Sequence, residues 1–187
     1  MKLLLIVLLF LTQGVKANEL PSLSFQEFVH LIPLWEVLPN SPQDVVGDNG
    51  RAYGYYQITS IMVADFNRIS GKNYTHEDCF DYQKSKEIAE VVLAHYAKHI
   101  QSKGITLKVD HLLFIWNGGG GAWRRVEYPI KDMKQLRLER YRDRAMYFIN
   151  TYLKNFRTNP SKAMPLARDN IKADEEEVHL TKLNNNP

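Results

Sequence analysis

Apolar residues recur every three or four positions in several separate stretches of this 187-residue chain. Such spacing places them on one face of a helix, and the clearest case runs from Ser85 to about Ser102, with Gly104 ending it. The same spacing predicts three further helices, over residues 60–70, 110–116 and 131–156. The last of these is dense in arginine, and we interpret most of its charge as a solvated helix face.

An additional predicted helix near the start leads to a glutamate in apolar surroundings. Ser24 can cap a helix that begins at Phe25, and Pro33 interrupts its pattern, so the helix is expected to bend or restart there. Glu36 then lies at or near the C-terminal end. The helix dipole does not stabilise a carboxylate at that end, and apolar neighbours raise its pKa by desolvation. Glu36 is therefore suited to donate a proton.

Between residues 39 and 56 the helical spacing disappears. This stretch is rich in Pro, Asn, Asp and Gly, which predicts turns and a short hairpin, with a tight turn at residues 48–50. Residues 73–82 are also predicted to form a loop. The predicted fold class is therefore mostly α (α+β), a helical domain with one small β or turn segment.

Both ends of the chain differ from this helical part. A lysine at position 2, an unbroken apolar run over residues 3–11 and small residues up to Ala17 are typical of a secretory signal peptide. The run is too short to span a membrane, so we expect export to the periplasm or the exterior without stable membrane insertion. The expected divisions are a signal peptide over 1–17, one domain over 18–158 and a flexible tail over 159–187.

Charge and cysteine content exclude some functions. Of the 24 Lys and Arg residues, Lys2 and Lys16 belong to the predicted signal peptide, which leaves 22 against 21 acidic residues. This balance does not favour a nucleic-acid partner. Cys79 is the single cysteine, so the chain has no internal disulfide, and we interpret it as a half-buried packing residue. His95 and His99 lack the pattern of a zinc-binding helix and are interpreted as core or interface residues; no metal or cofactor is expected.

Two carboxylates have the settings that glycoside hydrolysis requires. The reaction needs a carboxylic acid that is still protonated at the working pH, and usually a second carboxylate that stabilises or attacks the positive sugar. Glu36 has the apolar setting of the first, and Asp48, in a polar turn, has the solvated setting of the second. The alternative for Asp48 is that it only hydrogen-bonds its own turn.

These two residues belong to a longer pattern, Glu36-x11-Asp48-x-Gly50-x3-Gly54-x2-Gln57-Ile58. The pattern resembles the lysozyme superfamily, in particular the invertebrate-type lysozymes and the bacterial soluble lytic transglycosylases. The resemblance implies a lysozyme-like fold with the β/turn segment beside the catalytic cleft, Glu36 as general acid and Asp48 as its partner. It also implies that Tyr55 and Gln57 bind substrate in the cleft wall, whereas a buried structural amide is the alternative for Gln57.

A second block, Ile115-Trp116-Asn117-Gly118-Gly119, resembles the asparagine–glycine–glycine motif of the same family. That motif lines the cleft, which implies substrate contacts by Trp116, Asn117 and Gly118; a core position is the alternative for Trp116. The chain departs from the family in having Val37 after the acid, where serine is common, and Trp116 where histidine or tyrosine is commoner. Its single cysteine differs from the cysteine-rich animal members and favours the bacterial branch.

The predicted function is cleavage of the β-1,4 bond between N-acetylmuramic acid and N-acetylglucosamine in peptidoglycan, by a monomeric muramidase. One alternative is a lytic transglycosylase, which uses Glu36 alone and lets the sugar's own 6-hydroxyl close an anhydro ring. Another is a lysozyme-like protein that binds cell-wall glycan without cutting it. A third is an interaction protein that uses the arginine-rich helix and the acidic tail.

Overall fold

The computed structural model describes the chain from Leu23 to Phe156, apart from residues 38–40, 43, 127–128 and 130–131. The predicted signal peptide and the predicted tail lie outside the described residues. Within them the chain is mostly helical with one small antiparallel sheet, as predicted. The main helices are α1 (Phe25–Leu31), α2 (Pro33–Glu36), α3 (Ser60–Ser70), α4 (Tyr82–Ser102), α5 (Val109–Gly118) and α6 (Met133–Phe156).

Short 3-10 helices and strands connect these helices. The 3-10 helices are η1 (Asp48–Gly50), η2 (Glu77–Phe80) and η3 (Ala122–Arg125). The strands β1 (Val46–Gly47), β2 (Ala52–Tyr53) and β3 (Ile58–Thr59) form a sheet in that order, and Tyr53 pairs with Val46 on one side and Ile58 on the other. The predicted hairpin segment is therefore a three-stranded sheet.

Local signals in the sequence account for the first two helices. The Ser24 hydroxyl accepts a hydrogen bond from the Glu27 amide, and the Glu27 carboxylate accepts one from the Ser24 amide at 2.8 Å. This reciprocal pair satisfies two amides that a helix start leaves without partners. Pro33 is the first residue of α2, where its missing N–H costs nothing. The predicted cap and the predicted interruption are both confirmed, and Glu36 is the last residue of α2.

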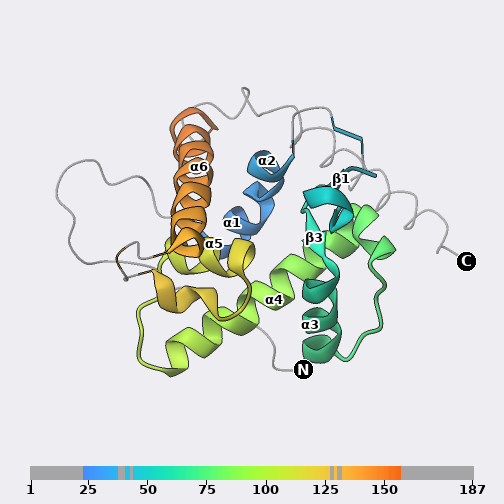
Figure 1. Ribbon diagram of the computed structural model, residues 1–187, viewed down its shortest axis with the longest axis horizontal. Coiled ribbons are helices and arrows are strands. Elements are labelled where there is room, and N and C mark those ends of the chain that lie inside the picture. The colour runs from blue at the N-terminus through green and yellow to red at the C-terminus, as the bar shows by residue number, and fades with distance from the viewer. Residues whose placement is uncertain (1–22, 38–40, 43, 127–128, 130–131, 157–187) are drawn as a thin grey trace, which may run out of the picture.

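Helices α1, α3 and α5 pack on α4, which crosses the lower part of the molecule in Figure 1, and α6 packs on α2 and α5. Helix α3 and the sheet lie on one side, α5 and α6 lie on the other, and α1 and α2 lie between them (Figure 1). One large cluster of buried side chains connects all six helices. The side chains of Glu36 on α2 and of residues on α5 and α6 are thereby brought to the middle of the molecule.

Three side chains differ from expectation in their burial. Cys79 is fully buried rather than half-buried, and burial raises the pKa of its thiol to about 12. His95 and His99 are exposed on α4, so the core alternative was wrong for both residues, and the interface alternative stays a prediction. No described helix is both long enough and apolar enough to cross a membrane.

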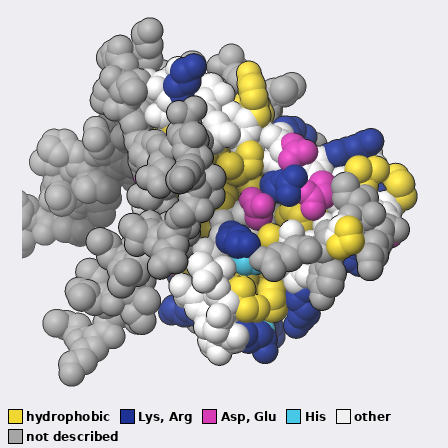
Figure 2. Space-filling model, turned by 90° about the vertical axis from the view of Figure 1, so that its left-hand side faces the viewer, with side chains coloured by type: hydrophobic (Ala, Val, Ile, Leu, Met, Phe, Trp, Pro, Cys, Tyr) yellow, Lys and Arg dark blue, Asp and Glu magenta, His cyan; other side chains and the backbone are white. Residues whose placement is uncertain are grey.

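Basic and acidic side chains lie close together on the α6 side of the molecule, as Figure 2 shows. Arg142 forms ion pairs with Glu139 and Asp143 on its own helix and approaches Asp110 of α5 at 3.9 Å. The predicted charged face of α6 is thus partly a bridge between two helices.

Replacement of Gly54 should destabilise the fold more than replacement of Gly71 does. The φ of Gly54 is +71°, and a Cβ there would lie 1.9 Å from the carbonyl oxygen of Cys79. Gly71 has nearly the same φ, +73°, with nothing within 4 Å of the Cβ position. Gly71→Ala should therefore cost about 1 kcal/mol of unfolding free energy, from backbone conformation alone.

Gly54→Ala should cost about 3 kcal/mol, because the steric conflict with buried backbone adds to the conformational term. Urea denaturation of the two variants measures the difference directly. Equal losses in the two variants would contradict the close approach of Gly54 to the Cys79 carbonyl.

Candidate active site

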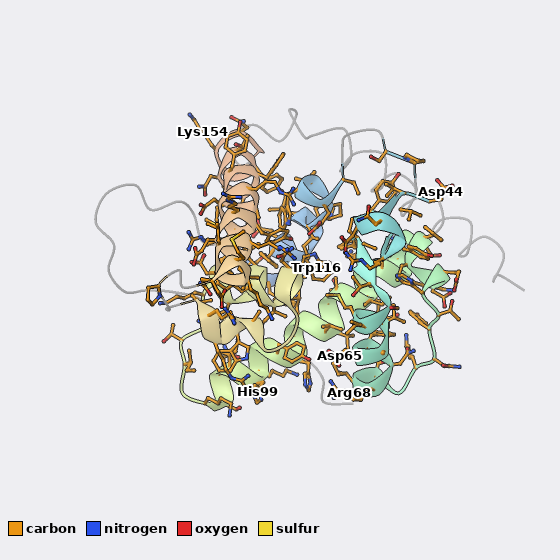
Figure 3. All side chains as sticks on the ribbon, viewed as in Figure 1. Asp44, Asp65, Arg68, His99, Trp116 and Lys154 are labelled. Carbon is orange, nitrogen blue, oxygen red and sulfur yellow. The ribbon has the colours of Figure 1, made fainter. Side chains whose placement is uncertain are left out.

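The Glu36 carboxyl group lies where three helices meet. Its Oε1 atom accepts a hydrogen bond from Trp116 Nε1 of α5 at 2.9 Å and a second, short one from the Tyr141 hydroxyl of α6. Trp35 Nε1, next to Glu36 on α2, donates to the same Tyr141 hydroxyl at 2.7 Å. In Figure 3, Trp116 lies near the centre of the molecule, between α6 and the side that carries the sheet. Tyr141 thus accepts one hydrogen bond and donates its own proton to Glu36.

Burial of the carboxyl group raises the pKa of Glu36 from 4.5 to about 7. Desolvation is the main cause, since a charged carboxylate loses more than a neutral acid when water is removed. Three weaker effects act the other way: the hydrogen bond from Tyr141, the positive charge of Arg144 and the hydrogen bond from Trp116. The group therefore holds its proton near neutral pH, as the apolar neighbours in the sequence predicted.

The two hydrogen bonds determine which of the two Glu36 carboxyl oxygens carries the acid proton. Both donors contact Oε1, and no described group forms a hydrogen bond with Oε2. Burial and the adjacent Glu36 charge hold the pKa of Tyr141 well above its ordinary value, so Tyr141 remains a donor. Since Oε1 accepts from two neutral donors, the acid proton of Glu36 belongs on Oε2. This arrangement can deliver a proton at a defined atom and stabilise the carboxylate that remains.

Asp48 lies on the exposed turn η1 and its side chain has a local partner. Its Oδ1 accepts a hydrogen bond from the Arg51 guanidinium at 2.9 Å, and Arg51 Nε also contacts the Asp48 carbonyl at 3.1 Å. Both Asp48 and Asn49 have positive φ, which matches the turn-forming alternative. No hydrogen bond or ion pair among the described residues joins Asp48 to Glu36. A catalytic role for Asp48 stays a prediction.

Gln57 and Tyr55 support the backbone of the sheet segment. Gln57 Nε2 donates to the Gly54 carbonyl at 2.7 Å, and its Oε1 fills the space beside Gly47, where a Cβ would lie 1.8 Å away. The Tyr55 hydroxyl donates to the Ser41 carbonyl at 3.0 Å. These contacts match the alternative in which Gln57 is a structural amide. Substrate contacts by either side chain stay a prediction.

Of the second motif, Trp116 is the residue that reaches the acid. Asn117 is exposed at the end of α5, and Gly118 packs where a Cβ would lie 2.7 Å from Ala122 and 2.8 Å from Leu138. Gly118 therefore has a packing reason to be glycine. Trp116 is buried and its ring forms an edge-to-face contact with the Tyr56 ring, so its position in the core and its contact with Glu36 occur together.

Tyr141 and Arg144 were not identified from the sequence. Tyr141 belongs to the buried stripe of α6, which consists of Leu138, Tyr141, Ala145, Ile149 and Leu153. A tyrosine within such a stripe needs a hydrogen-bond partner for its hydroxyl, so the sequence does indicate that a buried polar contact exists at this position. The identity of the partner, 105 positions away, is not contained in the local pattern.

Within the described part of the chain, no group of three or more His, Cys, Asp or Glu side chains could hold a metal ion. No protein-family model, curated protein or solved structure matches this chain.

Tyr141 should be important for stability as well as for the acid. In Tyr141→Phe the buried Trp35 N–H loses its acceptor and Glu36 loses a donor, and an unsatisfied buried polar group costs about 1–3 kcal/mol. We expect a loss of about 2 kcal/mol in the free energy of unfolding. Tyr147→Phe removes the same hydroxyl from an exposed tyrosine on the same helix and should change stability by less than about 0.5 kcal/mol. Chemical denaturation compares the two variants, and similar values would contradict the buried hydrogen-bond chain.

Proposed function

We propose that this chain is a peptidoglycan-cleaving glycosidase of lysozyme-like type, with Glu36 as its general acid. The observation that carries the proposal is the half-buried Glu36 carboxyl group, whose pKa is about 7 and whose Oε1 is held by two neutral donors. A general acid works best when its pKa lies near the working pH, because a large fraction of it is then protonated and it is still acidic enough to transfer the proton. The motif resemblance around Glu36 and Trp116 supports the same assignment.

In this mechanism the Oε2 proton of Glu36 passes to the glycosidic oxygen. The bond between that oxygen and the anomeric carbon breaks, and its electron pair stays with the departing sugar. The other sugar becomes an oxocarbenium-like cation. As Glu36 becomes negative, the hydrogen bonds from Trp116 and Tyr141 strengthen, because both now have an ionised acceptor. The resulting carboxylate then accepts a proton from the incoming nucleophile.

The identity of that nucleophile separates two versions of the reaction. In a muramidase it is water, with Asp48 supporting the cation or attacking it first. In a lytic transglycosylase it is the 6-hydroxyl of the same sugar, and no second carboxylate is needed. The engagement of Asp48 by Arg51 on an exposed turn favours the second version. Export to the periplasm or the exterior, action as a monomer and peptidoglycan strands as partner complete the proposal.

The direct test is mass spectrometry of the soluble sugars that the purified chain releases from peptidoglycan. Glu36→Gln should lower the release rate at least about 100-fold, the lower end of general-acid contributions. Glu77→Gln removes an exposed carboxylate in the same way and should leave the rate unchanged. Near-full activity in Glu36→Gln would refute the assignment.

The products and one further variant then decide between the versions. Anhydro-muropeptides, together with an active Asp48→Asn variant, would identify a lytic transglycosylase. Reducing-end muropeptides and an inactive Asp48→Asn variant would identify a muramidase. Retention of glycan without any release would leave a binding protein with no catalysis.

A further inference from the structure

Arg144 places a positive charge beside the candidate acid. Its guanidinium carbon lies 5.5 Å from the centroid of the Tyr141 ring, and the hydroxyl of that ring contacts Glu36. The charge acts on both groups, since it lowers the pKa of Glu36 and that of Tyr141. Arg144 itself is exposed. The guanidinium thus lies at the solvent side of the buried hydrogen-bond chain.

The guanidinium differs from several other arginines because it has no acidic partner among the described residues. Arg51 is paired with Asp48, Arg125 with Asp132, and Arg142 with acids of α5 and α6. Arg144 forms no ion pair with a described acid, and it donates no hydrogen bond to a described residue. None of its five N–H donors is therefore used by another side chain or carbonyl in the described part of the chain.

The neighbouring acid does not neutralise this charge. Glu36 is largely protonated below its pKa of about 7, so Arg144 then faces a neutral carboxyl group. Arginine itself stays charged at every relevant pH. When the site is ready to donate a proton, Glu36 therefore does not cancel the positive charge of Arg144, and this charge favours an anionic group on the ligand.

We propose that Arg144 binds a carboxylate on the side arm of the muramic acid whose glycosidic bond lies at Glu36. This inference rests on the proposed function and adds an anion-recognition site to it. The muramic acid ring carries a lactyl ether at C3, two carbons from the anomeric carbon at which the bond breaks. The arm ends in a free carboxylate on denuded strands or continues into a stem peptide that carries its own carboxylates. A guanidinium can hold either carboxylate with two parallel hydrogen bonds.

The site would then distinguish peptidoglycan from neutral amino-sugar polymers, because an uncharged sugar gives the guanidinium no counter-ion. Arg144 is a specificity-determining residue in this account. A role limited to lowering the pKa of Glu36 would affect charged and neutral substrates alike, and this difference makes the two roles separable.

The test uses matched glycan substrates that differ in charge. Denuded strands with free lactyl carboxylates and strands that keep their stem peptides are each compared with a copy whose carboxyl groups are converted to neutral methylamides. We expect the full chain to show a KM about tenfold lower for the charged copy of at least one pair, which matches the strength of a charge-assisted hydrogen bond. The pair that shows the difference identifies the source of the carboxylate.

Arg144→Gln should abolish this difference, with KM for the charged copy rising about tenfold and kcat changing less. Arg144→Lys keeps the charge without the planar fork and should restore part of the difference. Arg140→Gln, an exposed arginine one turn earlier on α6, is the control and should behave as the unmodified chain does.

An unaltered preference for charged glycan in Arg144→Gln would overturn the inference. So would an equal fall in activity on charged and neutral copies, which would indicate pKa tuning alone. Both results leave the proposed function intact. By contrast, if the unmodified chain cleaves none of the four substrates and Glu36→Gln behaves identically, the proposed function fails and the inference fails with it.

Discussion

The hydrogen bonds to Glu36 Oε1 impose a demand on the whole fold, because their donors come from distant parts of the chain. Trp116 is 80 positions from Glu36 and Tyr141 is 105 positions away. Both donors reach the carboxyl group only when α5 and α6 pack against α2. Trp35 adds a third indole or phenol group to the same network by contacting Tyr141 at 2.7 Å. The hydrogen bonding of the Glu36 carboxyl group therefore depends on the packing of these three helices.

This arrangement also has an energetic cost. A folded-state pKa of about 7 against 4.5 for ordinary glutamate means that the folded chain holds the proton more tightly than the unfolded chain does. The cost is absent below pH 4.5, grows as pH rises towards 7 and is then complete, at roughly 3 kcal/mol. A site that served structure alone would gain nothing from such a penalty. An acid that must still carry a proton near neutral pH requires it.

Much of the local structure followed from the sequence because its causes are local. The cap at Ser24 and the restart at Pro33 each depend on residues within one turn. The raised pKa of Glu36 was also predictable, since its apolar neighbours adjoin it in sequence. Gln57 shows the limit: the motif implied a substrate contact, which stays a prediction, and its described hydrogen bond is with the turn itself, as the structural alternative expected.

The parts that were missed depend on contacts between distant residues. The tyrosine in the buried stripe of α6 indicated a buried hydroxyl, but its partner was set by helix packing. Arg144 looked like one more arginine of a solvated face, and only the fold places it beside Tyr141. A core position was one of two alternatives for His95 and His99, because their spacing matched the apolar stripe of α4, whereas the buried stripe is offset from them.

The measurement that tests the central claim most directly is an NMR titration of the Glu36 carboxyl carbon in ¹³C-labelled protein. Its signal is identified by its absence from the spectrum of Glu36→Gln. The account predicts a midpoint at about 7. A midpoint near 4.5, the ordinary value for glutamate, would show that the carboxyl group is not desolvated, and it would contradict the proposed role of Glu36 as a proton donor at neutral pH.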